Sequence, residues 1–314
     1  MKNSNRGRKA FTMLELLFVI VIMGILAKFG VELLSQAYKS FIFSKINNKL
    51  QSDSAYATEL ISKRLENRIK QSVIYRNPTL GNSDVNFKSL DSGADANATV
   101  LEWIGTDIEG YRSGTWSGII DLNSTVTNLN QIMSINTNTT NIDNLIKILS
   151  DNNSTVNDAA IYFVGNYTAN HKWGWDGNLT EFDVQANVDI YPIQNDANLS
   201  LFKPALTSLG GINTFNGVSA KEYYKLAWTA YAVALENYNA ATNMGDLFLY
   251  SNYQPWKGEQ YDDGGINVRK DLILNNVSSF QFRAAGSLIK IQVCTKDVLI
   301  ASEEYSLCKE KTVY

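Results

Sequence analysis

An apolar run near the N-terminus constrains this chain more than any other feature. It extends from Phe11 to Ala27 and is interrupted only by Thr12, Glu15 and Gly24. As a helix that rises 1.5 Å per residue, it is roughly 25 Å long, about the thickness of the hydrocarbon core of a bilayer. The run therefore predicts one membrane-spanning helix.

The charges beside this run predict its orientation. The residues before it include no acidic side chain and four basic ones, Lys2, Arg6, Arg8 and Lys9. A basic flank stays in the cytoplasm, so the rest of the chain is expected on the far side of the membrane. A secretory signal would end in small residues at a cleavage site. Here the run continues directly into more helix-forming sequence, Lys28-Phe29-Gly30-Val31.

Glu15 is an unusual residue for this position. An isolated carboxylate at mid-bilayer costs about 2.5–3.5 kcal/mol on insertion scales, so such a residue is a functional candidate that needs a partner. The alternative is a plain signal anchor that happens to hold a glutamate near its edge.

The stretch Lys9–Leu17 (KAFTMLELL) resembles the cleavage and methylation signal of type IV pilins and type II secretion pseudopilins. The resemblance implies that a prepilin peptidase cuts between Ala10 and Phe11 and methylates the new N-terminus at Phe11. It also implies that Glu15 is the acid of the fifth mature position, which acts in assembly. Ala10 stands where the family usually has glycine. Because alanine is the smallest replacement, we expect processing to survive.

A cleaved chain would carry an ammonium group on Phe11 close to the membrane surface. Within the chain, Glu15 lies four residues further on, which is one helical turn. Between chains, the carboxylate of one subunit would meet the terminus of the next and set their axial stagger. Removing one partner of a buried pair typically costs about 3–5 kcal/mol.

The helical pattern continues beyond the apolar run. Residues 31–77 repeat apolar side chains mostly three or four apart, and Asn77-Pro78 is a natural stop. A helix that is continuous from Thr12 through this range would be about 95 Å long. It holds no proline, so we expect a straight helix with Gly24 and Gly30 as its weakest points.

The exported part, residues 78–314, is expected to be β-rich. Residues 79–217 read as loop-rich insertions, with strands at Thr99–Ile104, Gly118–Leu122 and Ala159–Val164 and a helix at Ile142–Leu149. Residues 218–314 predict an antiparallel meander with a disulfide tail. Its strands are Tyr223–Leu235, Leu247–Tyr253, Asp271–Arg283 and Ser287–Thr295.

The predicted fold class is α+β and pilin-like. A long N-terminal membrane-spanning α-helix packs on an antiparallel β-meander with loop-rich insertions. The expected segments are a cleaved basic leader at 1–10, a membrane or filament-core helix at 11–30, its amphipathic continuation at 31–77 and an exported domain at 78–314.

The chain has two cysteines, Cys294 and Cys308. An even count on the exported, oxidising side indicates a disulfide. Closing a loop of about 15 residues would contribute roughly 3 kcal/mol. Two separate buried thiols are the alternative, and the resemblance to pilins, which often carry a C-terminal disulfide loop, agrees with the pairing.

The segment His171–Asn178 (HKWGWDGN) concentrates two tryptophans and the single histidine. One interpretation is an aromatic contact surface for a partner or a glycan. The interpretation that we favour is a glycine-rich turn whose indoles fill the edge of the core. A third alternative is a calcium loop with Asp176, Asn178, Thr180 and Asp183 as ligands. The spacing of these residues does not match the EF-hand pattern.

No residue pattern indicates an enzyme, a cofactor or a metal. A single histidine excludes a two-histidine metal site, and the sequence has no nucleophile elbow, Walker loop or Cys-x-x-Cys pair. The adjacent acids Asp262-Asp263 and Glu303-Glu304 would alternate faces in a strand, which suits acid–base catalysis badly. Removing the leader leaves 24 basic against 31 acidic residues, a net charge of -7, which argues against nucleic acid as a partner.

These observations predict a minor pilin or pseudopilin that is stored in the inner membrane as a single-pass protein. The resemblance implies as partners other pilin subunits, prepilin peptidase, membrane lipid and an inner-membrane assembly platform with its ATPase. The body of about 235 residues after Pro78 favours a tip position, with its domain in the periplasm or in an extracellular filament. The alternatives are a repeated major subunit and an anchored binding or hydrolytic protein whose leader is not cleaved.

Overall fold

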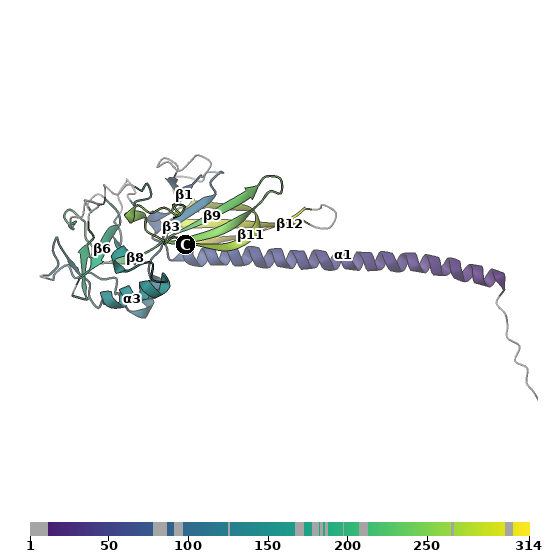
Figure 1. The fold of residues 1–314 in the computed structure, drawn as a ribbon, viewed down its shortest axis with the longest axis horizontal. Helices are drawn as coiled ribbons and strands as arrows, with labels where there is room; N and C mark the ends of the chain where they lie inside the picture. Colours follow the sequence, from purple (N-terminus) through teal and green to yellow (C-terminus); the bar gives the residue numbers. More distant parts are fainter. Residues whose placement is uncertain are drawn as a thin grey trace, which may run out of the picture.

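The fold is a long helix that projects like a stalk from a β-rich body (Figure 1). It is seen in a computed structural model that describes residues 12–77, 87–90, 97–124, 126–166, 173–177, 182, 185, 188–196, 198–206, 213–264, 267–298 and 304–314. The pilin-like α+β architecture expected from the sequence is confirmed.

Helix α1 (Met13–Glu66) has 54 residues without interruption. At 1.5 Å per residue it is about 81 Å long. The expectation that it would continue to residue 77 is wrong. Asn67 caps its C-terminus by donating its backbone N–H to the carbonyls of the last turn. A short 3₁₀ turn (Lys70–Ser72) follows, and the β-favouring residues after it enter strand β1 (Ile74–Arg76).

The main sheet has eight antiparallel strands in the order β13-β12-β11-β10-β9-β3-β1-β2. The predicted meander is therefore present in its last five strands. Besides β1, the strands are β2 (Phe87–Ser89), β3 (Val100–Ile104), β9 (Ala230–Asn239), β10 (Met244–Tyr253), β11 (Arg269–Ala285), β12 (Leu288–Val298) and β13 (Glu304–Val313).

Three predictions about this sheet need correction. The predicted strand Tyr223–Leu235 is divided at Trp228 and Thr229, and its first part, β8 (Tyr224–Ala227), joins a different sheet. Strand β13 was expected to be a tail, but it forms the edge of the main sheet. Strands β2 and β3 also belong to the main sheet, although they lie within the range assigned to insertions.

The described residues from Asp107 to Trp228, which we call the lobe, form a second sheet with its own helices. The sheet order is β4-β7-β6-β5-β8. The predicted strand Gly118–Leu122 forms only isolated bridges at Ile119 and Ile120. The other elements of the lobe are α2 (Ile108–Ser113), β4 (Ile132–Met133), α3 (Thr139–Leu149), a 3₁₀ turn (Val156–Asp158), β5 (Ala160–Phe163), β6 (Tyr191–Asn195) and β7 (Leu201–Pro204).

The two faces of the main sheet bury two different cores. On β3, Leu101 and Trp103 belong to the cluster that packs against α1, whereas Val100 and Ile104 belong to the cluster shared with the lobe. Alternate residues of a strand point to opposite faces, so this strand is buried on both sides. The helix supplies one stripe of side chains to the first core, Ala57, Ile61 and Leu65.

A buried arginine holds the end of α1 against the sheet. Arg68 is 2% exposed and donates to three main-chain oxygens: that of Leu65 at 2.8 Å, that of Ser287 at 3.0 Å and that of Tyr314 at 3.3 Å. Ser287 lies in the turn between β11 and β12, and Tyr314 follows β13. One guanidinium therefore ties the helix to two other parts of the fold.

An ion pair buried between the main sheet and the lobe connects these two parts. Arg76 on β1 pairs with Glu102 on β3, whose carboxylate also accepts from the hydroxyl of Tyr253 at 2.9 Å. Arg76 donates to the carbonyl of Trp175 at 2.9 Å. Burial raises the pKa of the Glu102 carboxyl, and the arginine opposes that rise. Burial and the adjacent carboxylate hold the pKa of Tyr253 well above its usual value.

We predict that Arg76→Met destabilises the protein by about 3–5 kcal/mol, because it leaves the Glu102 carboxylate buried without its cation. The double variant Arg76→Met/Glu102→Leu should lose less stability than the single variant, since neither charge remains buried. Urea unfolding of the detergent-solubilised chain measures both. In the single variant, the folded state holds a proton on Glu102 more tightly than the unfolded state does. Its loss of unfolding free energy relative to the wild type should therefore shrink as the pH falls from 7 towards 5. A double variant as unstable as the single one would contradict the pairing.

Candidate functional site

The first turn of α1 places the acid that the sequence singled out. Glu15 lies at the third helical position, and its Oε2 accepts from both the backbone N–H and the hydroxyl of Thr12, each at 3.2 Å. The Thr12 hydroxyl accepts from the backbone N–H of Glu15 at 3.4 Å. This is a reciprocal capping box, which satisfies backbone donors that a helix start leaves free.

The carboxylate of Glu15 therefore points back toward the N-terminal end of α1. Ala10 and Phe11, the predicted processing residues, lie outside the described residues. A negative charge in the first turn is favoured by the helix dipole. In the sequence, Glu15 comes four residues after Phe11.

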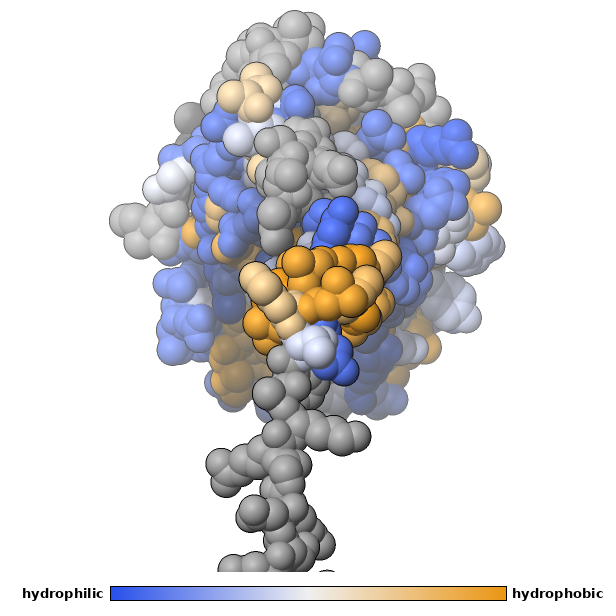
Figure 2. Space-filling view, turned by 90° about the vertical axis from the view of Figure 1, so that its right-hand side faces the viewer, coloured by the Kyte–Doolittle hydropathy of each residue, from blue (hydrophilic) through white to orange (hydrophobic). Residues whose placement is uncertain are grey.

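The N-terminal part of α1 is an exposed apolar surface. Every side chain from Met13 to Phe41 is exposed, and Leu50 is the first buried residue of the helix. Figure 2 looks along the stalk and shows this apolar cluster in front of a mainly hydrophilic body. Among the described residues, α1 is the one helix long and apolar enough to cross a membrane. Such a surface needs lipid or other apolar helices around it.

A hairpin of the main sheet holds α1 where the helix leaves the body. The ring of Phe43 lies 5.1 Å from that of Tyr305, centroid to centroid. The Tyr305 hydroxyl donates to the side chain of Asn47 at 3.2 Å, and the Thr295 hydroxyl donates to the carbonyl of Leu50 at 3.3 Å. Both donors belong to the β12–β13 hairpin, so this hairpin fixes the direction of the stalk.

The predicted cysteine pair lies in the same hairpin. Cys294 on β12 and Cys308 on β13 are direct register partners and form a disulfide. The link closes a sequence separation of 14 residues. In the chain-entropy model a loop of this length contributes roughly 3 kcal/mol. The covalent bond therefore stabilises the hairpin that contacts the helix.

The tryptophans of the segment His171–Asn178 belong to the core. Trp173 is 1% exposed and Trp175 is 2% exposed, and both pack in the cluster shared by the lobe and the main sheet. The favoured interpretation, a turn whose indoles fill the core, is confirmed for these two residues. His171 and Asn178 lie outside the described residues, as do Thr180 and Asp183 of the imagined calcium loop.

The other candidates for chemistry do not assemble into a site in the described part of the chain. No group of three or more metal-ligating side chains is found among those residues. Asp263 accepts from the backbone N–H of Gln260 at 2.7 Å and so caps a turn. Glu303 lies outside the described residues.

Taken together, the structure has a pilin-like α+β architecture with one N-terminal helix, α1, that is long and apolar enough to cross a membrane. Residues 5–27 match the family described as the prokaryotic N-terminal methylation motif. This match is consistent with a type IV pilin or pseudopilin, and it supports prepilin-type processing and a single-pass membrane anchor. No curated protein and no solved structure matches the chain.

Sequence reasoning missed two features of this region. One is the role of Thr12, although the spacing Thr-x-x-Glu at Thr12–Glu15 is the signature of a capping box. The other is the grip of the β12–β13 hairpin on α1, which depends on long-range packing. No local pattern in the sequence places Tyr305 beside Asn47.

We predict that the exposed run of α1 is membrane-embedded before assembly. Ile22→Asp puts a charge into the middle of the run at a cost of about 2.5–3.5 kcal/mol, so the membrane-inserted fraction should fall. Asn48→Asp changes an exposed residue of the same helix outside the run and serves as the control. Carbonate extraction of cell membranes measures the fraction for each variant. Equal retention of both variants would contradict the prediction.

Proposed function

We propose that this protein is a minor pilin or pseudopilin. A prepilin peptidase removes residues 1–10 and methylates Phe11, and α1 then enters a type IV pilus-like or type II secretion filament. Its role is structural rather than catalytic. The observation that carries the proposal is the coincidence of the methylation motif at residues 5–27 with a helix whose side chains are all exposed from Met13 to Phe41.

The exposed run explains why assembly and membrane storage use the same segment. In the bilayer, lipid covers the apolar side chains. In a filament, the apolar helices of neighbouring subunits would cover them instead. Transfer from one environment to the other keeps this surface out of water throughout, so the apolar surface itself opposes release of the subunit into solution.

The shape of the body supports a place at the tip of the filament. The lobe extends the body beyond the C-terminal end of α1, away from the stalk (Figure 1). A subunit repeated along a shaft must leave room for its neighbours above and below. Bulk at this end is accommodated more easily on a terminal subunit.

The same reasoning sets the proposed location and partners. The basic leader faces the cytoplasm, α1 crosses the inner membrane, and the body lies in the periplasm or on an extracellular filament. The partners are prepilin peptidase, other pilin or pseudopilin subunits, membrane lipid and an inner-membrane platform that drives assembly.

Mass spectrometry of the native N-terminus tests the processing step. We predict a mature chain that begins at Phe11 and carries one methyl group on its amino nitrogen. Deleting the peptidase gene of the host should restore the intact leader. A native protein that keeps residues 1–10 would contradict the proposal and favour an uncleaved anchor.

Glu15→Ala tests the assembly step. We predict that the variant stays in the membrane but enters filaments at least about tenfold less, because the buried ammonium of a neighbour would lose its counter-charge. Glu32→Ala removes an exposed acid further along the same helix and should have no effect. Quantitative immunoblotting of sheared or purified filaments measures incorporation.

A further variant separates assembly from helix capping. Thr12→Val breaks the capping box but keeps the Glu15 carboxylate. If the carboxylate pairs with another subunit, Thr12→Val should assemble far better than Glu15→Ala. Equal loss in both variants would show that Glu15 acts only through its local contact with Thr12.

A further inference from the structure

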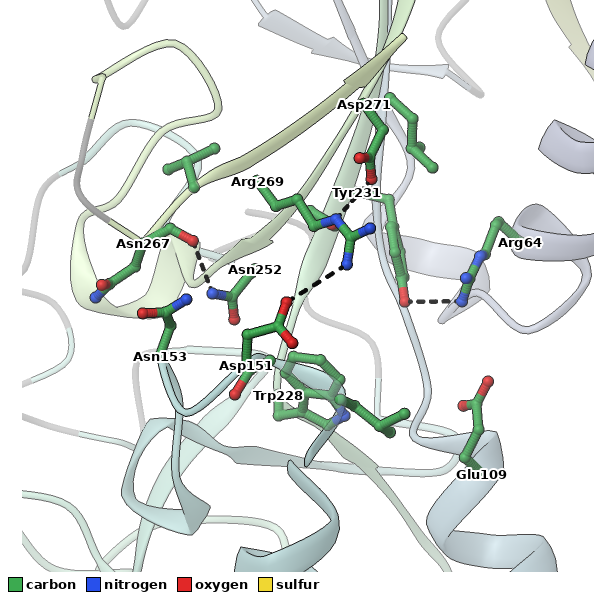
Figure 3. A pocket seen from close by; sticks show the side chains of 15 residues that line it. Arg64, Glu109, Asp151, Asn153, Trp228, Tyr231, Asn252, Asn267, Arg269 and Asp271 are labelled. Carbon is green, nitrogen blue, oxygen red and sulfur yellow. Dashed lines mark hydrogen bonds and ion pairs between the residues drawn. The ribbon is translucent and has the colours of Figure 1, made fainter. Parts of the chain in front are cut away.

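A cleft of about 440 Å³ lies where the main sheet, the end of α1 and the lobe meet. Its sheet wall comes from β9, β10 and β11, its helix wall from Arg64 and its lobe wall from Glu109 and the residues after α3 (Figure 3). A second hollow of about 290 Å³ shares Arg64, Glu109 and Tyr231 with it, so the two hollows are adjacent. The volume lies in the range of small-ligand sites, roughly 300–1,000 Å³.

Arg269 forms ion pairs with two of the three acids of the cleft. The Nε of Arg269 lies 2.8 Å from a carboxylate oxygen of Asp271, and its Nη1 lies 3.8 Å from one of Asp151. Asp151 belongs to the lobe and Asp271 to β11, so the arginine links the two walls (Figure 3). The first cavity is lined by two arginines and three carboxylates, which leaves no surplus of positive charge for a polyanion.

Three other polar side chains of the cleft, those of Arg64, Glu109 and Asn153, have no charged partner among the described residues. Arg64 donates to the Tyr231 hydroxyl at 3.4 Å, and its guanidinium lies 5.5 Å from the centre of that ring. Within the described residues it has no carboxylate partner, and the Glu109 carboxylate has neither a hydrogen bond nor an ion pair. The side-chain amide of Asn153 is also free in that part of the chain. A donor, an acceptor and an amide thus face the same space.

Aromatic rings complete the lining. Tyr231 is half-buried and stacks on Trp103 at 5.8 Å, which fixes its ring. Trp228 is 8% exposed and forms part of the lining of the cleft. Flat rings beside mixed donors and acceptors suit a molecule that has an apolar C–H face and polar groups at its edge.

The position of the cleft argues against a peptide. An extended peptide adds to the free edge of a sheet, and the edges of the main sheet are β13 and β2, whereas β9, β10 and β11 are inner strands. An amphipathic helix needs an apolar groove, and this lining is mostly polar. Hydroxyl groups both donate and accept, so a polyol matches a lining that offers an arginine, a carboxylate and an amide.

We propose that this cleft binds a short neutral oligosaccharide. One sugar ring lies against Tyr231 and Trp228, and its hydroxyls donate to Glu109 and accept from Arg64 and Asn153. The proposal does not depend on filament assembly, because all of its residues belong to the body or to the end of α1 that packs on it.

Saturation-transfer NMR on the full chain in lipid nanodiscs tests this proposal. Nanodiscs are chosen because sugar-based detergents would compete for the site. The neutral probes are maltotriose, cellotriose and triacetylchitotriose. Trigalacturonate tests for an anionic ligand, and a blocked polar tripeptide tests for a peptide ligand. We expect at least one neutral trisaccharide to bind with micromolar to millimolar affinity, and Tyr and Trp fluorescence titration should give the same dissociation constant.

Matched variants locate the binding. Arg64→Ala and Glu109→Gln should each lower the affinity for the trisaccharide at least about tenfold. The controls, Arg283→Ala on β11 and Glu222→Gln in the lobe, replace exposed residues outside the cleft and should leave affinity unchanged. Circular dichroism confirms that each variant is folded.

Three outcomes would overturn the proposal. They are the absence of binding by all three neutral probes at about 10 mM, preferential binding of trigalacturonate or the tripeptide, and neutral binding that both cleft variants leave intact. The mature N-terminus and filament incorporation are read independently, so failure here leaves the proposed filament role standing.

Discussion

The fold is governed by an apolar helix surface that the chain itself does not cover. From Met13 to Phe41 the side chains of α1 are exposed, and Leu50 is the first residue of the helix that the body buries fully. Exposing this apolar segment to water is unfavourable, which favours its burial in lipid or against other apolar helices. The rest of the structure is organised to hold this helix at a fixed angle: Arg68 ties its last turn, and the β12–β13 hairpin grips its middle.

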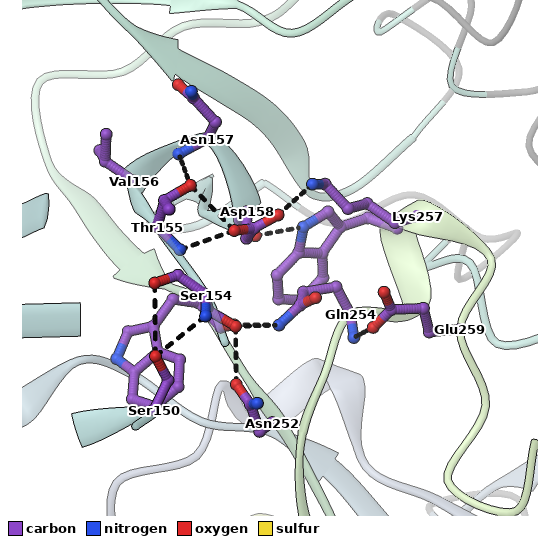
Figure 4. A network of polar contacts seen from close by, with 12 residues as sticks. Ser150, Ser154, Thr155, Val156, Asn157, Asp158, Asn252, Gln254, Lys257 and Glu259 are labelled. Atoms are coloured by element: carbon purple, nitrogen blue, oxygen red, sulfur yellow. Dashed lines mark hydrogen bonds and ion pairs between the residues drawn. The ribbon is translucent and has the colours of Figure 1, made fainter. Parts of the chain in front are cut away.

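The main sheet packs against other parts of the chain on both of its faces. Its α1 face packs the stripe of Ala57, Ile61 and Leu65, and its other face packs the aromatic core of the lobe. A polar network at the lobe boundary, drawn in Figure 4, complements that apolar packing: Ser154 donates to Asn252 at 2.6 Å, and Gln254 donates to the carbonyl of Trp228 at 2.8 Å. Fully satisfied buried networks of this kind fix one relative arrangement of the parts that they join. The lobe is therefore an integral part of the body rather than a loose decoration.

The sequence determined the outline of the fold and of its N-terminal segment, for identifiable reasons. The apolar run, Glu15 and the alternating strands of the last hundred residues are local patterns, and each was visible without a structure. The end of α1 was misplaced because Ile69 and Val73 keep a helical spacing although they lie in a turn and before a strand. The lobe and the cleft were not visible, because Glu109, Asp151 and Tyr231 are far apart in sequence and meet only through tertiary packing. The paired charges of Arg76 and Glu102 escaped for the same reason.

The disulfide has a mechanical consequence. In the proposed filament, tension along the stalk would reach the body through the contacts of Phe43, Asn47 and Leu50 with two neighbouring strands. Because Cys294 and Cys308 join these strands directly opposite each other, neither strand can slide or peel away without the other. The load is thus shared between both strands and spread into the sheet, so the joint between stalk and body resists traction better than hydrogen bonds alone would allow.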